Sequence, residues 1–117
     1  CRMLSKNKSF KVFPSSEVSI SEAHISRFSG CISATVNQTL FLSSSAWAKK
    51  DQDIGSLIEQ IKEIRQEISK DSLIPSIKYL VSRRTENKDW LTLLPPLNTV
   101  SEPRKVELAS LYNKVLL

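Results

Sequence analysis

A stripe of aliphatic side chains in the second half of the 117-residue chain constrains its fold more than any other feature. Its members recur at helical spacing: Ile54, Leu57, Ile58, Ile61, Ile64 and Ile68. Such spacing keeps side chains on one side of an α-helix, whereas a half-buried strand needs strict alternation. Asp51 and Asp53 precede the stripe, where acidic residues cap a helix and favour the positive end of its dipole. The sequence therefore predicts an amphipathic helix from Ile54 to about Ser69.

Two more helices are predicted after it. Asp71 or Ser72 caps the first, and Pro75 falls in its first turn, where proline is tolerated. The expected inner stripe of this helix is Ile74, Ile77, Leu80 and Val81. Because the connection is only two or three residues long, the two helices are expected to be antiparallel neighbours. Ser101 starts the last helix, whose expected stripe is Val106, Ala109, Tyr112 and Leu116.

A short apolar element lies between these helices and consists of Trp90, Leu91, Leu93 and Leu94. It ends at Pro95 and Pro96, because neither proline can continue a helix. The predicted fold is therefore mainly α, a small antiparallel bundle of three helices plus this short element. The last stripe is still running at Leu117. We therefore expect the chain to be a fragment whose bundle is completed by a following segment.

The positive charge of the chain lies in its first half. The formal net charge is +5; residues 1–50 carry seven basic and two acidic side chains, whereas residues 51–117 carry ten of each. Residues 1–50 also contain twelve serines. This shift predicts a boundary near residue 50, with a basic, Ser-rich segment at 1–50 and a helical domain at 51–117.

One interpretation of residues 1–50 is a transit peptide, because organellar presequences are basic, Ser-rich and poor in acid. Residues 30–48 carry no charge and end in Ala46-Trp47-Ala48. Ala46 and Ala48 are candidate leader-cleavage residues, since a signal peptidase accepts only small side chains at these two places. Cleavage after Ala48 would give a mature chain that starts at Lys49. A leader of this kind is typical of nuclear-encoded proteins of the thylakoid lumen.

The other interpretation is folded structure, as short strands or as a short helix packed on the second half. Apolar residues alternate at Phe10 and Val12, at Val18 and Ile20, and at Ile32, Ala34 and Val36. Alternation of this kind predicts edge strands and an α+β fold. The chain would then be part of a larger protein, such as an enzyme, and would lack its active site. In a third interpretation, residues 1–50 are a basic arm for nucleic acid or anionic lipid, which predicts steep salt dependence.

Residues with catalytic or ligand chemistry form no motif. His24 is the only histidine and has no nucleophile that the sequence places beside it. Cys1 and Cys31 lack the spacing of a zinc pair or a redox C-x-x-C and are predicted to be unpaired. The two glycines form no phosphate-binding loop, and no carboxylates have metal-site spacing. We therefore expect a protein that is not an enzyme, with no catalytic residue, metal or cofactor.

Four residues are candidate partner contacts: Arg83, Arg84, Lys88 and Trp90. Arginine grips phosphate or acidic groups, and an exposed tryptophan suits a protein interface. The alternative is a basic helix end next to a tryptophan in the core. The neutral balance of residues 51–117 argues against nucleic acid. No apolar run approaches the ~20 residues that span a bilayer, because the uncharged residues 28–48 are interrupted by Asn37, Gln38 and Thr39. We therefore expect a larger protein complex as partner and at most a peripheral membrane association.

Residues 97–105 read Leu-Asn-Thr-Val-Ser-Glu-Pro-Arg-Lys, and Leu108, Leu111 and Lys114-Val115-Leu116 follow. This order of features resembles the middle of PsbQ-like proteins, which are small four-helix bundles on the lumenal side of photosystem II or of the chloroplast NDH complex. The resemblance implies a chloroplast protein of the thylakoid lumen that takes part in photosynthesis. It further implies a non-catalytic extrinsic or assembly subunit without a cofactor, which binds through its helical faces and basic residues.

Overall fold

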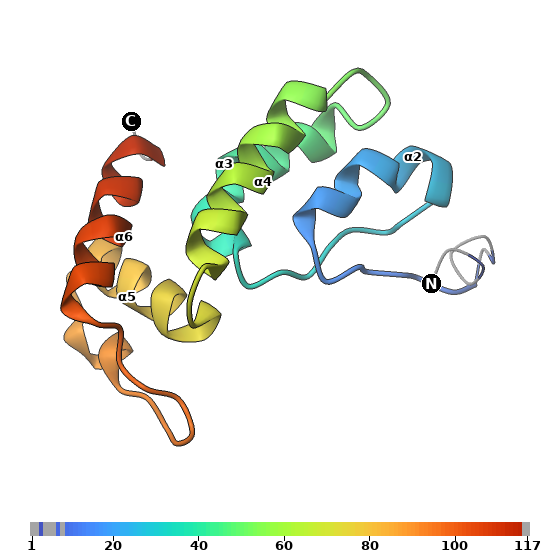
Figure 1. The fold of residues 1–117 in the computed structure, drawn as a ribbon. Helices are drawn as coiled ribbons and strands as arrows, with labels where there is room; N and C mark the ends of the chain where they lie inside the picture. Colours follow the sequence, from blue (N-terminus) through green and yellow to red (C-terminus); the bar gives the residue numbers. More distant parts are fainter. Residues whose placement is uncertain (1–2, 4–6, 8, 116–117) are drawn as a thin grey trace. The chain divides into compact units, whose positions relative to one another are not determined.

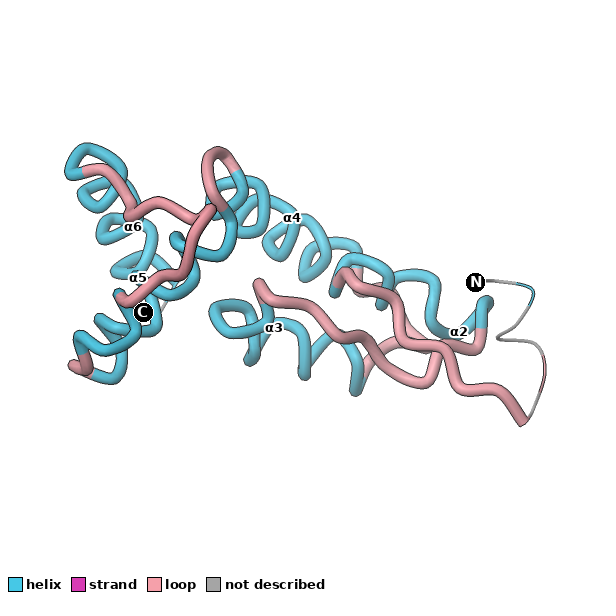
Figure 2. The backbone as a smooth tube through the Cα atoms, turned by 90° about the horizontal axis from the view of Figure 1, so that it is seen from below, coloured by secondary structure: helices cyan, strands magenta, loops and turns pink. Residues whose placement is uncertain are grey.

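The computed structural model of the chain describes residues 3, 7 and 9–115. The elements, with η for a 3-10 helix, are η1 (Glu17–Glu22), α2 (Ala23–Ser26), α3 (Val36–Ala48), α4 (Gly55–Ser69), α5 (Leu73–Thr85), η2 (Lys88–Leu91) and α6 (Glu102–Val115). In the part of the chain that is described, these helices are joined by loops and no strand is formed (Figure 2). The prediction of a mainly helical protein is therefore confirmed.

The prediction of strands in the N-terminal half is wrong for the described residues. Residues 17–22 form η1 and residues 36–48 form α3. The hydroxyl of Ser16 accepts a hydrogen bond from the backbone N–H of Val18 at 3.3 Å and so caps η1. A serine at the start of a helix gives the backbone a local hydrogen bond. This bond favours a helix over a strand where the alternation of apolar and polar residues is only a few residues long. The α+β alternative is thereby excluded for the described residues.

The chain divides into two compact units, Cys1–Glu63 (unit 1) and Ile64–Leu117 (unit 2). Helix α4 contributes its first part to unit 1 and its last part to unit 2. The compositional boundary near residue 50 falls in the turn between α3 and α4 (Figure 1). Its interpretation as a processing boundary stays a prediction.

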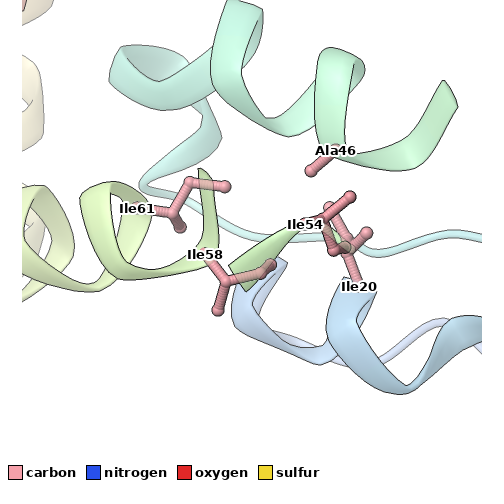
Figure 3. Close-up of a cluster of buried hydrophobic side chains, with 5 residues drawn as sticks. All are labelled: Ile20, Ala46, Ile54, Ile58 and Ile61. Atoms are coloured by element: carbon pink, nitrogen blue, oxygen red, sulfur yellow. The ribbon is translucent and has the colours of Figure 1, made fainter. Parts of the chain in front are cut away.

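The core of unit 1 combines η1, α3 and α4 (Figure 3). Its buried members are Ile20, Ala46, Ile54, Ile58 and Ile61. Asp53 starts α4 as predicted, because its Oδ1 accepts a hydrogen bond from the backbone N–H of Gly55 at 2.9 Å. The first part of the α4 stripe, at Ile54, Ile58 and Ile61, therefore packs with side chains from residues 1–50.

The core of unit 2 is formed by α4, α5 and α6. Its buried apolar residues are Ile64, Ile68, Ile77, Leu80, Val81 and Leu108. Helix α5 begins after Ser72 with Pro75 in its first turn, as predicted. Two predicted inner positions are wrong, since Ile74 is 43% exposed and Val106 is 71% exposed. Leu116, predicted for the same stripe as Val106, lies outside the described residues.

The inner face of α6 differs from the prediction because it holds a buried arginine. The Arg104 side chain is 7% exposed, and its Nη1 lies 3.3 Å from Glu67 Oε1 and 2.6 Å from Glu107 Oε2. Its Nη2 also donates to the backbone carbonyl of Glu67. That carbonyl belongs to the last turn of α4, at the negative end of the helix dipole, and it also accepts a hydrogen bond from the backbone N–H of Lys70 at 3.4 Å. Arg104 therefore ties α6 to the end of α4 within unit 2.

Candidate functional site

An exposed apolar segment begins at η2 in unit 2. Trp90 is 45% exposed, Leu91 37%, Leu94 77% and Leu97 39%. We call residues 90–97 the 90–97 segment; it lies in the connection between α5 and α6 (Figure 1). The predicted short element is only partly helical, because η2 ends at Leu91 and the following chain is not helical. Neighbouring apolar side chains that a fold leaves in water are typical of a binding surface.

A hollow of about 70 Å³ borders this segment. It is lined by Pro75, Lys78 and Tyr79 of α5, by Leu91, Leu93, Thr99 and Val100, and by Lys105 of α6. We call it the α5 hollow. Its volume is about half that of an engineered cavity of roughly 150 Å³ that binds benzene, and far below the roughly 300–1,000 Å³ of small-molecule sites. The α5 hollow therefore fits one short aliphatic side chain better than an organic cofactor.

Two lysines give the α5 hollow its charge. Lys78 Nζ donates to the backbone carbonyl of Thr92, and an ammonium group has two further N–H donors. Lys105 Nζ lies 2.6 Å from Glu102 Oε1, but the Glu102 side chain is 85% exposed. A surface ion pair of this kind adds little stability and exchanges readily with other anions. Both ammonium groups are therefore able to bind an external carboxylate.

The four predicted contact residues occupy different environments. Arg83 Cζ lies 5.9 Å from the centre of the Tyr112 ring, a cation–π contact that joins α5 to α6. Arg84 is exposed in the last turn of α5, and Lys88 is exposed at the start of η2. Trp90 is exposed, which agrees with the interface interpretation and not with a position in the core.

The sequence interpretation missed Lys78 and Lys105. One signal was available in the sequence. Lys78 and Tyr79 lie three and four residues after Pro75, so all three share a face of α5. The contribution of Lys105 depends on how α6 packs on α5, which no spacing shows.

A second exposed apolar set lies on α3 in unit 1. Leu40 is 54% exposed and Phe41 78%, and no residue from Val36 to Ala48 carries a charge. The predicted cleavage residues lie at the end of this helix: Ala46 is fully buried in the core, whereas Ala48 is exposed. A peptidase needs an extended chain, so this position is accessible only before unit 1 folds. Cleavage there stays a prediction.

A buried carboxylate organises the polar interior of unit 1. Glu17 is fully buried, and its Oε1 accepts hydrogen bonds from the hydroxyls of Thr35 at 2.5 Å and Thr39 at 3.1 Å. The hydroxyls of Ser33 and Ser43 lie within hydrogen-bond distance of these threonines, at 3.0 Å from Thr35 and 3.1 Å from Thr39. Two threonine hydroxyls therefore contact the carboxylate directly, and two serine hydroxyls extend the network. It therefore serves to join η1 to α3.

The remaining residues with reactive side chains are separate from one another. His24 is exposed on α2. Cys31 is a half-buried free thiol, and its pKa is raised by burial and, to a smaller extent, by the charge of Glu17. A raised pKa lowers the fraction of thiolate and makes the sulfur a weak nucleophile. Cys1 lies outside the described residues.

Within the described residues, no three His, Cys, Asp or Glu side chains come together in a way that would hold a metal ion. None of the helices described is both long and apolar enough to cross a membrane. Comparison with family models, with curated proteins and with solved structures finds no match to this chain.

Proposed function

We propose that this chain is a non-catalytic subunit or assembly factor that docks on a larger protein complex through the 90–97 segment. The observation that carries the proposal is the exposure of Trp90, Leu91, Leu94 and Leu97 next to the α5 hollow. Tryptophan and arginine supply much of the binding energy in protein interfaces, and Arg83 and Arg84 end the helix that precedes η2. The segment therefore has an apolar centre with basic neighbours in the sequence, the composition expected of an interface.

The location we propose is the lumenal side of a thylakoid membrane, with a photosynthetic complex as partner. Its support is the resemblance of residues 97–105 to PsbQ-like proteins, together with the basic, Ser-rich composition of residues 1–50. Three residues of the resembling segment, Thr99, Val100 and Lys105, line the α5 hollow. The resemblance therefore falls on the surface that we propose for docking.

N-terminal sequencing of the mature protein tests the leader. A start at Lys49 supports it, and a mature chain that retains residues before Ala48 contradicts it. Cleavage would remove Ile20 and Ala46 from the unit 1 core. The exposed isoleucines of α4 would then need a partner to cover them.

Co-migration of the purified full-length chain, added to native extracts, tests the docking surface with two matched double variants. Trp90→Ser/Leu94→Ser removes two exposed apolar side chains from the 90–97 segment, and Leu40→Ser/Phe41→Ser removes two from α3. We expect the wild-type chain and the α3 variant to migrate with a large complex, and the 90–97 variant to migrate as a free chain of 13.2 kDa.

Circular dichroism of each purified variant establishes that its helices are intact. The proposal is wrong if the Trp90→Ser/Leu94→Ser chain migrates with the complex as the wild type does. It is also wrong if only the α3 variant leaves the complex, because docking would then use the uncharged face of unit 1.

A further inference from the structure

The α5 hollow combines apolar walls with positive charge. Proline, leucine, valine and the tyrosine ring supply the apolar part, and Lys78 and Lys105 supply two ammonium groups. Its volume of about 70 Å³ suits a single aliphatic side chain. A ligand that fills the hollow and also satisfies the lysines therefore needs a short apolar group next to carboxylates.

We infer that the α5 hollow binds an acidic segment of a partner protein by taking up one of its aliphatic side chains while Lys78 and Lys105 bind neighbouring carboxylates. This inference rests on the proposed docking function and specifies the chemistry of the partner. Unit 2 carries nine basic and six acidic side chains, so its net charge of +3 favours an acidic partner over a basic one. A peptide is favoured over a lipid surface because the apolar groups line a recess instead of projecting from a helix face.

The two lysines are expected to bind by different routes. Lys78 keeps its bond to the Thr92 carbonyl and uses its other N–H donors for the ligand. Lys105 must exchange the exposed carboxylate of Glu102 for a carboxylate of the ligand. Glu102 is thus a competitor, and its removal should strengthen binding.

The probe is the synthetic peptide acetyl-Gly-Glu-Leu-Asp-Gly-amide, titrated into the full-length chain at low salt. Two control peptides separate the two requirements: one has alanine in place of leucine, and the other has glutamine and asparagine in place of the acids. Amide shifts in two-dimensional NMR spectra report binding. We expect saturable shifts at Leu91, Leu93 and Val100 with the probe, and affinities at least about fivefold weaker with either control peptide.

Two single variants of the α6 ion pair give opposite expectations. Lys105→Ala should weaken binding about threefold to fivefold, and Glu102→Gln should strengthen it about twofold, as expected for one solvent-accessible charge pair. The matched controls are Lys62→Ala and Glu59→Gln, because Lys62 and Glu59 form an ion pair of the same spacing and the same 2.6 Å distance on α4. Both controls should bind the probe as the wild type does. Lys78→Ala also removes the hydrogen bond to Thr92 and could therefore misfold. In that case the Lys105 and Glu102 variants alone test the inference.

Three results would overturn the inference. The probe produces no saturable shifts at millimolar concentration, or the alanine peptide binds as tightly as the leucine peptide, or Glu102→Gln weakens binding. A further experiment uses vesicles of phosphatidylcholine and phosphatidylserine. If the chain binds these vesicles in a way that depends on Lys105 and does not bind the peptide, the ligand of the hollow is a lipid surface and the inference is wrong.

Failure of this inference is distinguishable from failure of the docking proposal. If Lys105→Ala and Glu102→Gln chains migrate with the native complex and the probe peptide does not bind, docking through the 90–97 segment stands and the chemistry assigned to the hollow is wrong. If Trp90→Ser/Leu94→Ser leaves migration unchanged and the probe binds as expected, the hollow binds acidic peptides but does not anchor the chain to the complex.

Discussion

The buried Arg104 provides the sharpest test of the packing in unit 2. We expect Arg104→Ala to lower the free energy of unfolding of this unit by about 3 kcal/mol and Arg104→Met to lower it by only about 1 kcal/mol. The difference follows from what each substitution leaves in place. Methionine retains an unbranched stem in the buried space, whereas alanine leaves a void.

The expected loss of unfolding free energy in Arg104→Ala has two parts. Alanine removes two stem methylenes, which costs about 1.6 kcal/mol at about 0.8 kcal/mol each. It also leaves the Glu67 carbonyl without its guanidinium donor, which costs about 1 kcal/mol or slightly more. The two carboxylates add little, because the side chains of Glu67 and Glu107 are 30% and 59% exposed and regain water. Methionine avoids the first cost, while both substitutions remove the buried Arg104 Nε, which has no hydrogen-bond partner among the described residues.

Urea unfolding followed by Trp90 fluorescence measures this in a Trp47→Phe background, since the two tryptophans lie one in each unit. Lys105→Ala is the matched control, because Lys105 pairs with Glu102 at the same 2.6 Å distance on the same helix but is 30% exposed. Its cost should be well below 1 kcal/mol. The reasoning is refuted if Arg104→Met costs as much as Arg104→Ala, or if Arg104→Ala costs no more than the control.

Three further outcomes are expected. The pKa of Glu67 is lowered by the hydrogen bond from Lys70, against the opposing effect of burial, and further by Arg104. Its ionised form therefore stabilises unit 2 above its ordinary pKa of 4.5, and this contribution is lost as pH falls through the lowered value. Glu67→Gln should therefore reduce the loss of unfolding free energy at acid pH, followed by Trp90 fluorescence. An unchanged dependence on pH would contradict this. In a Cys1→Ser background, Cys31 should react with iodoacetamide more slowly than a cysteine peptide at neutral pH, and Glu17→Gln should raise its rate; a rate equal to that of the peptide would show that the thiol pKa is not raised. Gly30 has φ +158°, and a Cβ there would lie 3.0 Å from the Phe13 ring. Gly30→Ala should therefore lower the free energy of unfolding of unit 1 by about 1 kcal/mol or more, measured by Trp47 fluorescence in a Trp90→Phe background. A variant as stable as the parent chain would contradict this.

The helices of the second half were predictable because their signals are local. The stripe of α4, the Asp53 cap and the proline in the first turn of α5 each depend on residues within a few positions of one another. The inner face of α6 was not predictable in the same way. Arg104 takes an inner position because Glu67, 37 residues earlier, supplies a carboxylate and a carbonyl at the end of α4. A periodicity of apolar residues cannot indicate a buried position held by a cation.

The first half shows the same limit. The Glu17 carboxylate reaches Thr35 and Thr39 over separations of 18 and 22 residues, and these bonds join η1 to α3. The sequence of residues 1–50 left three interpretations open: a leader, short strands, or a short helix packed on the second half. For the candidate site, the exposure of Trp90 was one of two alternatives that the sequence left open. The α5 hollow was not predicted, because it combines three separate parts of the chain.

The 90–97 segment is exposed, but it is not loosely attached. Lys78 holds the Thr92 carbonyl, the Thr92 N–H donates to the carbonyl of Asp89 at 3.1 Å, and the Leu97 N–H donates to the carbonyl of Leu94 at 3.0 Å. The Leu94 side chain is 77% exposed and adds little to the stability of the isolated chain, while the backbone bonds of the segment fix its position. A surface fixed before binding loses less conformational entropy when a partner arrives. This arrangement is the one expected if the apolar side chains of the segment serve a partner and not the fold, and it makes Lys78 a support of the surface as well as part of the hollow.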